Sequence, residues 1–220
     1  MNKIYYAKIS DEIVPDMFNK LLNLVSTQER EKITRLRFDS DKMLSLYARV
    51  LLRAVVYQTQ NISNTEILIS ENEYGKPFLK NNKDFHFNIS HTKNAVVLVV
   101  YDSCVGVDIE RVRPINTNVA RRFFTKTELE YVVKTNCDRR FCEVWTKKES
   151  YVKFKGRGIG LGLDRFDVLS DELSKNFSFF KQDNYFISVY SEGLSKNNNL
   201  VSLSQEDIEK MANLNLQLTN

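Results

Sequence analysis

Apolar residues in the first part of the chain fall into segments with either helical or strand spacing. Residues 39–60 carry apolar side chains at every third or fourth position, which predicts a long and largely buried helix. Residues 3–9 alternate weakly and predict a strand, as do residues 67–70. Ser26-Thr27-Gln28-Glu29 has the S/T-x-x-E sequence of a capping box, so we expect a basic helix to begin there.

The mixture of helices and strands continues in the second part of the chain. Strands are expected at 85–90, 95–101 and 105–110, and the short connection between the first two favours a hairpin. Further along, the pattern predicts helices at 118–124, 125–135, 142–154 and 204–211, and strands at 166–169, 177–181 and 185–190. Blocks of helices and strands thus lie on either side of about residue 103, without a shift in composition between them.

The composition restricts the classes of partner. Hydrophobic residues make up 42% of the chain and charged residues 27%, which is typical of a globular protein, and no apolar run is long enough for a membrane helix. The formal net charge of +4 suits an anionic small molecule or an acidic protein and is too small to indicate nucleic acid. Three cysteines without zinc or CxxC spacing, and no signal-peptide pattern, predict buried free thiols in a cytoplasmic protein.

Four charged residues form the most informative pattern. Asp108 and Glu110 are two apart, so on a strand they share a face, and Glu149 and Lys153 are four apart, so on a helix they share a face. If that strand and helix meet, three carboxylates converge beside an ammonium group, and a hard divalent cation would relieve their repulsion. A metal beside a lysine is suited to handling phosphate esters. The alternative is a solvated helix face with ordinary i,i+4 pairs.

Other polar residues have both a structural and a functional interpretation. His91 follows a strand and can donate to a phosphate oxygen, but it makes a poor nucleophilic pair with Ser90, because adjacent strand residues point apart. Gly75-Lys76-Pro77 is a turn that carries a lysine. Thr125 and Glu128 fit a capping box, which gives Glu128 a structural alternative.

Five segments in this order and spacing resemble the 4′-phosphopantetheinyl transferase superfamily. They are Tyr74-Gly75-Lys76-Pro77, Phe87-Asn88-Ile89-Ser90-His91, Gly106-Val107-Asp108-Ile109-Glu110, Phe124-Thr125-Lys126-Thr127-Glu128 and Trp145-Thr146-Lys147-Lys148-Glu149-Ser150-Tyr151-Val152-Lys153. The length resembles the double-sized, monomeric type that serves peptide, polyketide and fatty-acid synthases. The resemblance implies an α+β fold with two similar halves in a pseudo-twofold arrangement and an active site in the cleft between them.

The implied reaction moves phosphopantetheine from coenzyme A to a serine hydroxyl of an apo carrier protein and releases adenosine 3′,5′-bisphosphate. The resemblance places coenzyme A binding and the basic helix in residues 1–103, and metal binding and catalysis in residues 104–220. The implied partners are coenzyme A and an acidic acyl or peptidyl carrier protein, whose charge is complementary to this chain. Nucleic acid and membrane are not expected as partners.

The resemblance also implies roles for particular residues. A bound Mg²⁺ ion, with Mn²⁺ as a substitute, is implied at three carboxylates: Asp108, Glu110 and Glu149. The coenzyme A phosphates are contacted by two residues at a strand end and by the helix lysine: Ser90, His91 and Lys153. The adenine nucleotide and its 3′-phosphate are bound by basic residues: Lys76, Arg30, Lys32 and Arg53.

Two features of the implied site stay open. The base that takes the serine proton is either Glu149 or Glu128, with Lys153 as the third catalytic residue. Glu29 stands where related proteins carry a basic residue, and Leu44 stands where they carry arginine, so the binding of the 3′-phosphate departs from the family pattern.

Two other classes of protein are compatible with the same residues. Carboxylates on a strand and a helix also suit a Mg²⁺-dependent phosphoesterase, which would release the bisphosphate from coenzyme A without a carrier protein. A basic binding module for an acidic protein would retain its partner but would have no affinity for coenzyme A.

Overall fold

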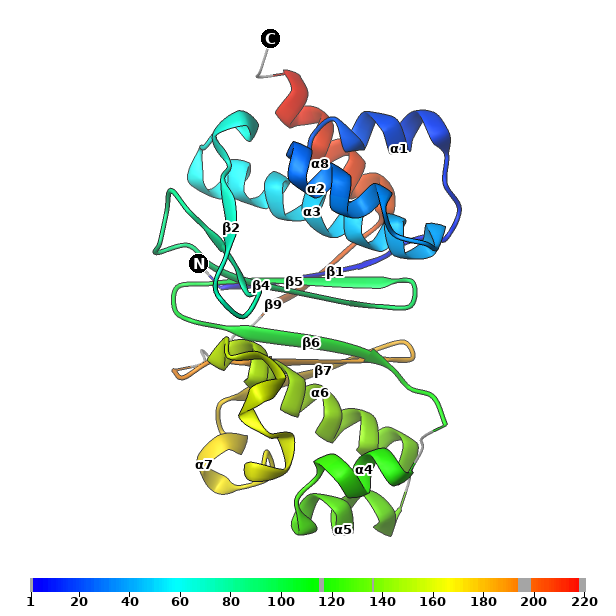
Figure 1. Ribbon diagram of the computed structural model, residues 1–220, viewed down its shortest axis with the longest axis vertical. Coiled ribbons are helices and arrows are strands. Elements are labelled where there is room, and N and C mark those ends of the chain that lie inside the picture. The colour runs from blue at the N-terminus through cyan, green and yellow to red at the C-terminus, as the bar shows by residue number, and fades with distance from the viewer. Residues whose placement is uncertain (1, 115–116, 136, 194–198, 218–220) are drawn as a thin grey trace.

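The computed structural model describes residues 2–114, 117–135, 137–193 and 199–217 (Figure 1). The elements before residue 103 are β1 (Lys3–Lys8), α1 (Pro15–Leu22), α2 (Thr27–Thr34), α3 (Asp39–Gln60), β2 (Ile69–Glu71), β3 (Pro77–Leu79), β4 (His86–Thr92) and β5 (Ala95–Tyr101). Those after it are β6 (Gly106–Arg111), α4 (Thr117–Phe123), α5 (Lys126–Lys134), α6 (Cys137–Lys155), α7 (Asp171–Ser174), β7 (Phe177–Gln182), β8 (Tyr185–Tyr190), β9 (Asn199–Leu203) and α8 (Gln205–Gln217). Short 3₁₀ turns occupy Asn64–Glu66, Gly158–Leu161 and Leu163–Arg165.

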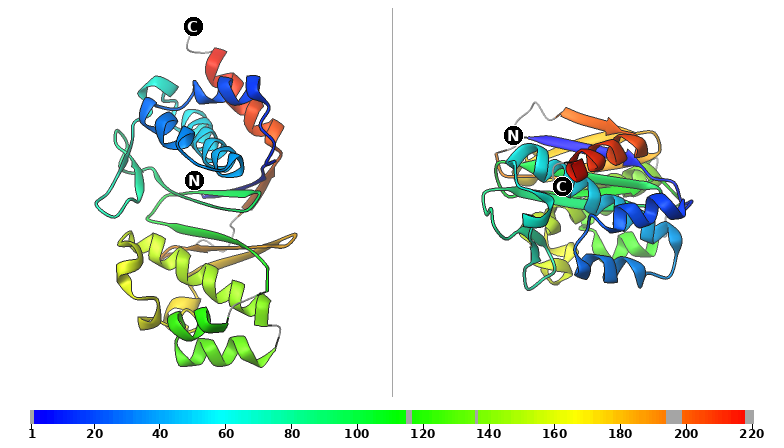
Figure 2. Two further views of the ribbon diagram at one scale, coloured as in Figure 1. Left: turned by 45° about the vertical axis from the view of Figure 1, so that its right-hand side comes forward. Right: turned by 90° about the horizontal axis from the view of Figure 1, so that it is seen from above.

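The elements stack in four layers (Figures 1 and 2). Helices α1, α2, α3 and α8 cover one face of a sheet with strand order β4-β5-β1-β9, and a second sheet of order β6-β8-β7 lies against the other face. The remaining helices, with α6 in direct contact with β6 and β8, cover the second sheet. This mixed arrangement of helices and sheets agrees with the expected class, and the predicted elements at 39–60, 95–101 and 185–190 are confirmed.

Strand β5 is buried on both faces, which explains the central apolar run of the sequence. Val96 and Leu98 belong to the core beneath α3, whereas Val97 and Val99 belong to the core between the two sheets, where they meet Val107 of β6. Complete burial stabilises each such side chain by about 1.5–3 kcal/mol relative to exposure. The inter-sheet core therefore fixes β4, β5 and β6 next to one another.

The C-terminal segment returns to the first sheet, and the sequence pattern did not reveal this. Strand β9 pairs in parallel with β1, so that Leu200 lies opposite Ile4. Helix α8 then buries Ile208 and Ala212 in the core beneath α3. A short strand that pairs across about two hundred residues leaves little local signal, because its partner determines its conformation.

Several expectations need correction. The strand predicted at 166–169 is wrong, because this segment lies in the turns between Leu163–Arg165 and α7 and its apolar side chains pack among helices. The helix predicted at 142–154 begins earlier, at Cys137. Only Cys142 is a buried thiol, since Cys104 and Cys137 are exposed. In the described part of the chain, no helix is both long and apolar enough to cross a bilayer.

Gly106 allows β6 to approach α6 closely. A Cβ atom there would lie 2.1 Å from the Ser150 carbonyl oxygen and 2.3 Å from the Phe154 backbone nitrogen, both of which are fixed by the helix. We expect Gly106→Ala to lower the free energy of unfolding by about 3 kcal/mol through overpacking, measured by urea titration. Gly160→Ala is the matched control, because a Cβ at Gly160 meets no atom within 4 Å. Equal stability of the two variants would contradict this account of the contact.

Candidate functional site

The close contact of β6 with α6 brings Asp108 and Lys153 together. The Lys153 ammonium Nζ lies 2.6 Å from Asp108 Oδ1 and 2.8 Å from the Ser90 hydroxyl oxygen of β4. Ser90 itself donates to Asp108 Oδ1 at 2.9 Å. Three elements thus contribute one residue each to a polar cluster at the junction of the two sheets, and the predicted proximity of the strand and the helix is confirmed.

Two further carboxylates surround Asp108. The pKa of Glu110 is raised by burial and then by the Asp108 charge, against the opposing charges of Arg113 and Lys153. The pKa of Glu149 is raised by the same two causes in the same order. Three acidic groups therefore share a region of low hydration, where the repulsion that the sequence predicts is present.

Asp108 has an oxygen available for a cation. Within the described ranges, its Oδ2 atom is buried and lacks a hydrogen-bond partner, which is unfavourable for a carboxylate. Oxygen donors of this kind suit a hard divalent ion such as Mg²⁺. The residues that the structure describes contain no ready-made group of three acidic, histidine or cysteine ligands. In the present arrangement it is the Lys153 ammonium that faces Asp108.

His91 follows Ser90 on β4. The protein around the ring limits its hydration, although the side chain as a whole is exposed, and this together with the Lys153 charge lowers its pKa. The ring is also within electrostatic range of Asp41 and Arg49 on α3. His91 therefore links the Asp108 cluster to the helix layer of the first half.

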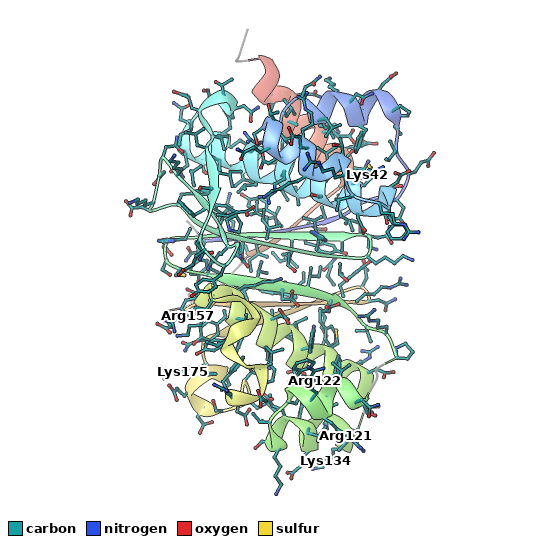
Figure 3. All side chains as sticks on the ribbon, in the orientation of Figure 1. Lys42, Arg121, Arg122, Lys134, Arg157 and Lys175 are labelled. Carbon is teal, nitrogen blue, oxygen red and sulfur yellow. The ribbon has the colours of Figure 1, made fainter. Side chains whose placement is uncertain are left out.

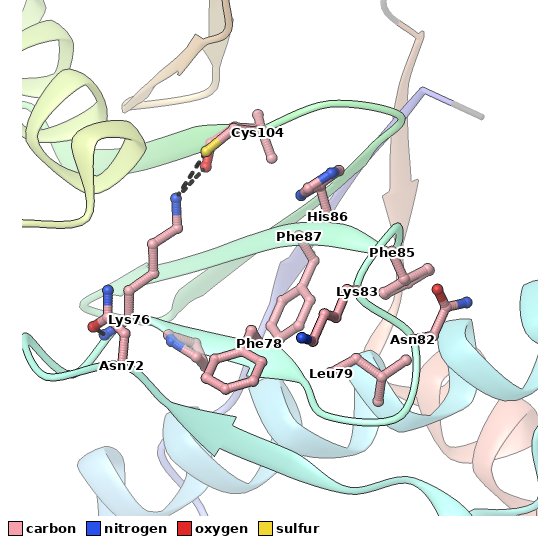
Figure 4. Close-up of a pocket in the computed structure, with 12 residues that line it drawn as sticks. Asn72, Lys76, Phe78, Leu79, Asn82, Lys83, Phe85, His86, Phe87 and Cys104 are labelled. Carbon is pink, nitrogen blue, oxygen red and sulfur yellow. Dashed lines mark hydrogen bonds between the residues drawn. The ribbon is translucent and has the colours of Figure 1, made fainter.

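A groove of about 250 Å³ adjoins this cluster. It is lined by the turn at Tyr74 and Lys76, by Glu149 and Lys153 of α6, and by the glycine loop that follows α6. Lys76 stabilises the groove: its Nζ donates to the carbonyl oxygens of Val105 at 3.0 Å and Phe154 at 3.1 Å. Burial lowers the pKa of Lys76, and the exposed Cys104 thiol lies beside its ammonium (Figure 4).

The predicted basic cluster is engaged in contacts within the protein. Arg53 is buried, with Nη2 2.7 Å from Glu29 Oε2 and Nη1 donating to Asn64. Arg30 donates to the Leu22 carbonyl oxygen. Lys32 pairs with Glu71 at 2.8 Å on the surface, so it can be released at little cost. The structure thus brings Lys32 to a cavity but does not present the Arg53 guanidinium there.

Glu128 lies apart from the Asp108 cluster. Its carboxylate is completely buried and 2.7 Å from the Lys148 ammonium, and it also accepts hydrogen bonds from the backbone N–H groups of Thr125 and Val168. Lys148 donates in addition to the carbonyl oxygen of Phe166 at 2.8 Å. These contacts fully engage Glu128 in supporting the structure.

The sequence analysis did not predict that Lys148 is buried, because it considered this lysine only as part of a solvated helix face. The available signal was its place four residues after Val144 and four before Val152, both of which are buried. Residues at this spacing share a helix face, so a lysine between two buried valines must enter the core.

Two family models match the chain in succession. The first, described as "4′-phosphopantetheinyl transferase, N-terminal", covers residues 13–103, and the second, "4′-phosphopantetheinyl transferase superfamily", covers residues 104–204. The chain therefore belongs to the 4′-phosphopantetheinyl transferase superfamily, and it is a transferase.

Individual relatives agree with this assignment. The 4′-phosphopantetheinyl transferase Sfp of Bacillus subtilis (strain 168) is 33% identical over 169 residues, which are 76% of this chain and 75% of that protein. The 4′-phosphopantetheinyl transferase gsp of Aneurinibacillus migulanus is 36% identical over 76% of this chain and 70% of its own length. The L-aminoadipate-semialdehyde dehydrogenase-phosphopantetheinyl transferase of Mus musculus is 30% identical over 66% of this chain and 53% of its own.

Proposed function

We propose that this enzyme transfers 4′-phosphopantetheine from coenzyme A to a serine hydroxyl of an apo carrier protein and releases adenosine 3′,5′-bisphosphate. The observation that supports this most directly is the Asp108 cluster, which combines an unpartnered carboxylate oxygen, two carboxylates of raised pKa and an ammonium group. Two of its members, Glu149 and Lys153, line the groove. Family membership supports the phosphopantetheinyl group as the one that is moved.

Asp108, Glu110 and Glu149 would hold a Mg²⁺ ion, or Mn²⁺ in its place. When bound, the ion supplies Lewis-acid stabilisation of charge on phosphate oxygens. Lys153 and His91 bind the coenzyme A phosphates, and Ser90 holds the Lys153 ammonium in position through the bond at 2.8 Å. Lys76 fixes the turn that forms the nucleotide side of the groove, and Arg53 and Arg30 stabilise the basic helix.

Glu149 is the favoured general base. It lines the groove that the serine hydroxyl must enter, whereas Glu128 does not. Glu128 is fully hydrogen-bonded behind the surface, so we assign it to the support of α5 and α6. Under this assignment, residues 1–103 bind the nucleotide and residues 104–220 provide the acidic cluster and the base.

The surface charge supports an acidic carrier protein as the partner. Arg121 and Arg122 of α4, Lys134 of α5 and Lys175, the residue after α7, are exposed on the side of the molecule that covers the second sheet (Figure 3). Such a surface accelerates the encounter with an anionic domain and depends on ionic strength. We propose that the enzyme acts as a monomer in the cytoplasm, without nucleic acid or membrane.

The decisive experiment is incubation with coenzyme A, Mg²⁺ and a panel of apo carrier proteins, followed by intact-mass measurement. We expect one phosphopantetheine group on one carrier serine and stoichiometric release of the bisphosphate. Release of the bisphosphate without any carrier would instead indicate a phosphoesterase. Retention of a carrier without affinity for coenzyme A would indicate a binding module.

Magnesium is expected to stabilise the protein in a pH-dependent way. Since the pKa values of Glu110 and Glu149 are raised in the folded state, their contribution to stability is present below the ordinary value of 4.5 and is lost as pH rises through the folded values. A cation offsets that loss, so at a concentration of one hundred times Kd it adds about 2.7 kcal/mol near neutral pH, or about 5–10 °C in Tm. Near pH 4.5 the shift is smaller. Calorimetry that finds equal shifts at both pH values would contradict the assigned ligands.

A further inference from the structure

Strands β4 and β6 are each the outer strand of a sheet, and they contact each other at the junction of the two sheets. β4 begins the strand order β4-β5-β1-β9, and β6 begins the order β6-β8-β7. Among the described residues, no backbone ladder joins these two strands. An outer strand has N–H and C=O groups that its own sheet does not pair, so they need other partners. The junction therefore depends on side chains.

Three polar side chains of β4 form a row that is directed toward β6. Asn88, Ser90 and Thr92 are two residues apart, so they share one face of the strand. Phe87 and Ile89, on the opposite face, belong to the core beneath α3. The β4 polar row, as we name these three residues, therefore lies on the face that turns away from α3.

The two ends of the β4 polar row bind different parts of β6. Asn88 Oδ1 accepts from the buried backbone N–H group of Val107 at 2.9 Å. Thr92 Oγ1 donates to Glu110 Oε2 at 3.4 Å. Ser90, between them, makes the contact with the acidic cluster that is described above. The row thus fixes the backbone of β6 at one end and the side chain of an acidic residue at the other.

The turn that follows Thr92 is anchored to both sheets. The Tyr185 hydroxyl group of β8 donates to the carbonyl oxygen of Lys93 at 2.9 Å. On the other side, the amide group of Asn94 donates to the carbonyl oxygen of Ile9, the residue after β1, at 3.2 Å. The Thr92 hydroxyl group is therefore presented to β6 by a backbone that is held on two sides.

Thr92 is, in the described part of the chain, the residue that donates a hydrogen bond to the Glu110 carboxylate. The separation is long for a bond between two oxygens, so the carboxylate keeps room to move toward a cation. Hydrogen bonds from outside a metal site orient the groups that bind the ion. We propose that Asn88 and Thr92 are positioning residues of the acidic cluster. Asn88 fixes the offset of β6 along β4, and Thr92 holds the Glu110 carboxylate beside Asp108.

This inference rests on the proposed function, in which Glu110 is one of the ligands of Mg²⁺. It assigns the orientation of a ligand on the second sheet to a hydroxyl group on the first sheet. The metal affinity of the cluster then depends on the contact between the two sheets, and a change at Thr92 alters it without touching the ligands themselves.

The Thr92 contact is tested by binding of Mn²⁺ to the protein without coenzyme A, measured from the electron paramagnetic resonance signal of the free ion. Thr92→Val has nearly the same shape and lacks the hydroxyl group, and we expect it to raise the Kd about tenfold. Thr92→Ser keeps the hydroxyl group and is expected to stay within about twofold of the wild-type protein. Equal affinity of Thr92→Val and the wild-type protein would overturn the role of Thr92. Equal weakening by both variants would assign the effect to packing and would overturn it as well.

The transfer reaction separates positioning from folding. In Thr92→Val the Mg²⁺ concentration for half-maximal rate is expected to rise about tenfold, and excess Mg²⁺ is expected to restore most of the rate. Thr59→Val is the matched control, because Thr59 donates to the Val55 carbonyl oxygen within α3, and it should leave both quantities unchanged. A rate that falls by the same factor at every Mg²⁺ concentration would indicate a structural defect and refute the assignment.

The role of Asn88 is tested without metal, by amide hydrogen exchange at Val107. Asn88→Ala removes the acceptor, so the Val107 N–H group is expected to exchange about tenfold faster. Thr92→Val is expected to change this rate by less than about twofold, because Thr92 contacts the side chain of Glu110. Unchanged exchange in Asn88→Ala would refute the role of Asn88. Faster exchange in Thr92→Val would mean that Thr92 supports the whole junction, which would refute its separate role.

The failure of this inference and the failure of the proposed function are distinguishable. Transfer to a carrier by the wild-type protein, without any contrast between the Thr92 variants, would remove only the positioning role. A contrast in Mn²⁺ affinity without transfer by the wild-type protein would remove the proposed reaction and leave the acidic cluster as a metal site that Thr92 orients.

Discussion

Replacement of Asp108 by asparagine is expected to lower the rate of phosphopantetheine transfer by about 10²–10³-fold while the protein remains folded. Asparagine has nearly the same volume and retains an oxygen that can accept from Ser90 and Lys153. It removes the negative charge and replaces the unpartnered Oδ2 by an amide NH₂, which cannot hold a cation. The loss is therefore chemical and not structural.

The measurement is the initial rate of carrier labelling at saturating coenzyme A and Mg²⁺, followed by intact mass. Asp183→Asn is the control, because Asp183 is an exposed aspartate that pairs with Lys8 away from the site. The control is expected to retain the wild-type rate. A fully active Asp108→Asn protein would contradict the assignment of the acidic cluster as the catalytic centre.

Replacement of Lys148 by methionine is expected to lower the free energy of unfolding by about 3–5 kcal/mol. Methionine fills most of the space, but it leaves the buried Glu128 carboxyl group without its charged partner, and it removes donors from the carbonyl oxygens of Leu163 and Phe166. The energetic cost comes mainly from the isolated charge, since both side chains of the pair have 0% exposure.

A second variant separates charge from packing. Lys148→Met combined with Glu128→Gln removes both charges, and glutamine can still accept from the Thr125 N–H group of the capping box. Urea titration is expected to show that the double variant regains part of the lost stability. Lys155→Met, at the more exposed end of the same helix, is the control for loss of a lysine. If the single and double variants are equally unstable, the cost does not arise from the unpaired charge.

The parts of this fold that were predictable are those that local periodicity determines. The capping box at Ser26 and the buried run of β5 follow from residues a few positions apart. The meeting of Asp108 with Lys153 was also within reach, because strand and helix spacing placed each on a defined face. In each case the spacing along the chain identifies the same face of the helix or strand that packs against its neighbour in the structure.

The parts that were not predictable depend on partners that are distant in the sequence. Whether Arg53 is free or engaged depends on Glu29, which lies on another helix. Glu128 was a plausible base until its contact with Lys148 was known, and its capping box alone left both roles open. Charged residues of the same type can bind a substrate or support the fold, and only their burial and their ion-pair partners distinguish the two roles.

The return of the chain to its starting sheet has a practical consequence for making fragments. Because β9 forms the outer edge beside β1 and α8 packs on α3, residues 199–217 belong in space with the first hundred residues. Expression of residues 1–103 alone would leave β1 as an open edge, which is a template for aggregation. A self-sufficient version of that lobe requires a circular permutant that carries β9 and α8 ahead of β1.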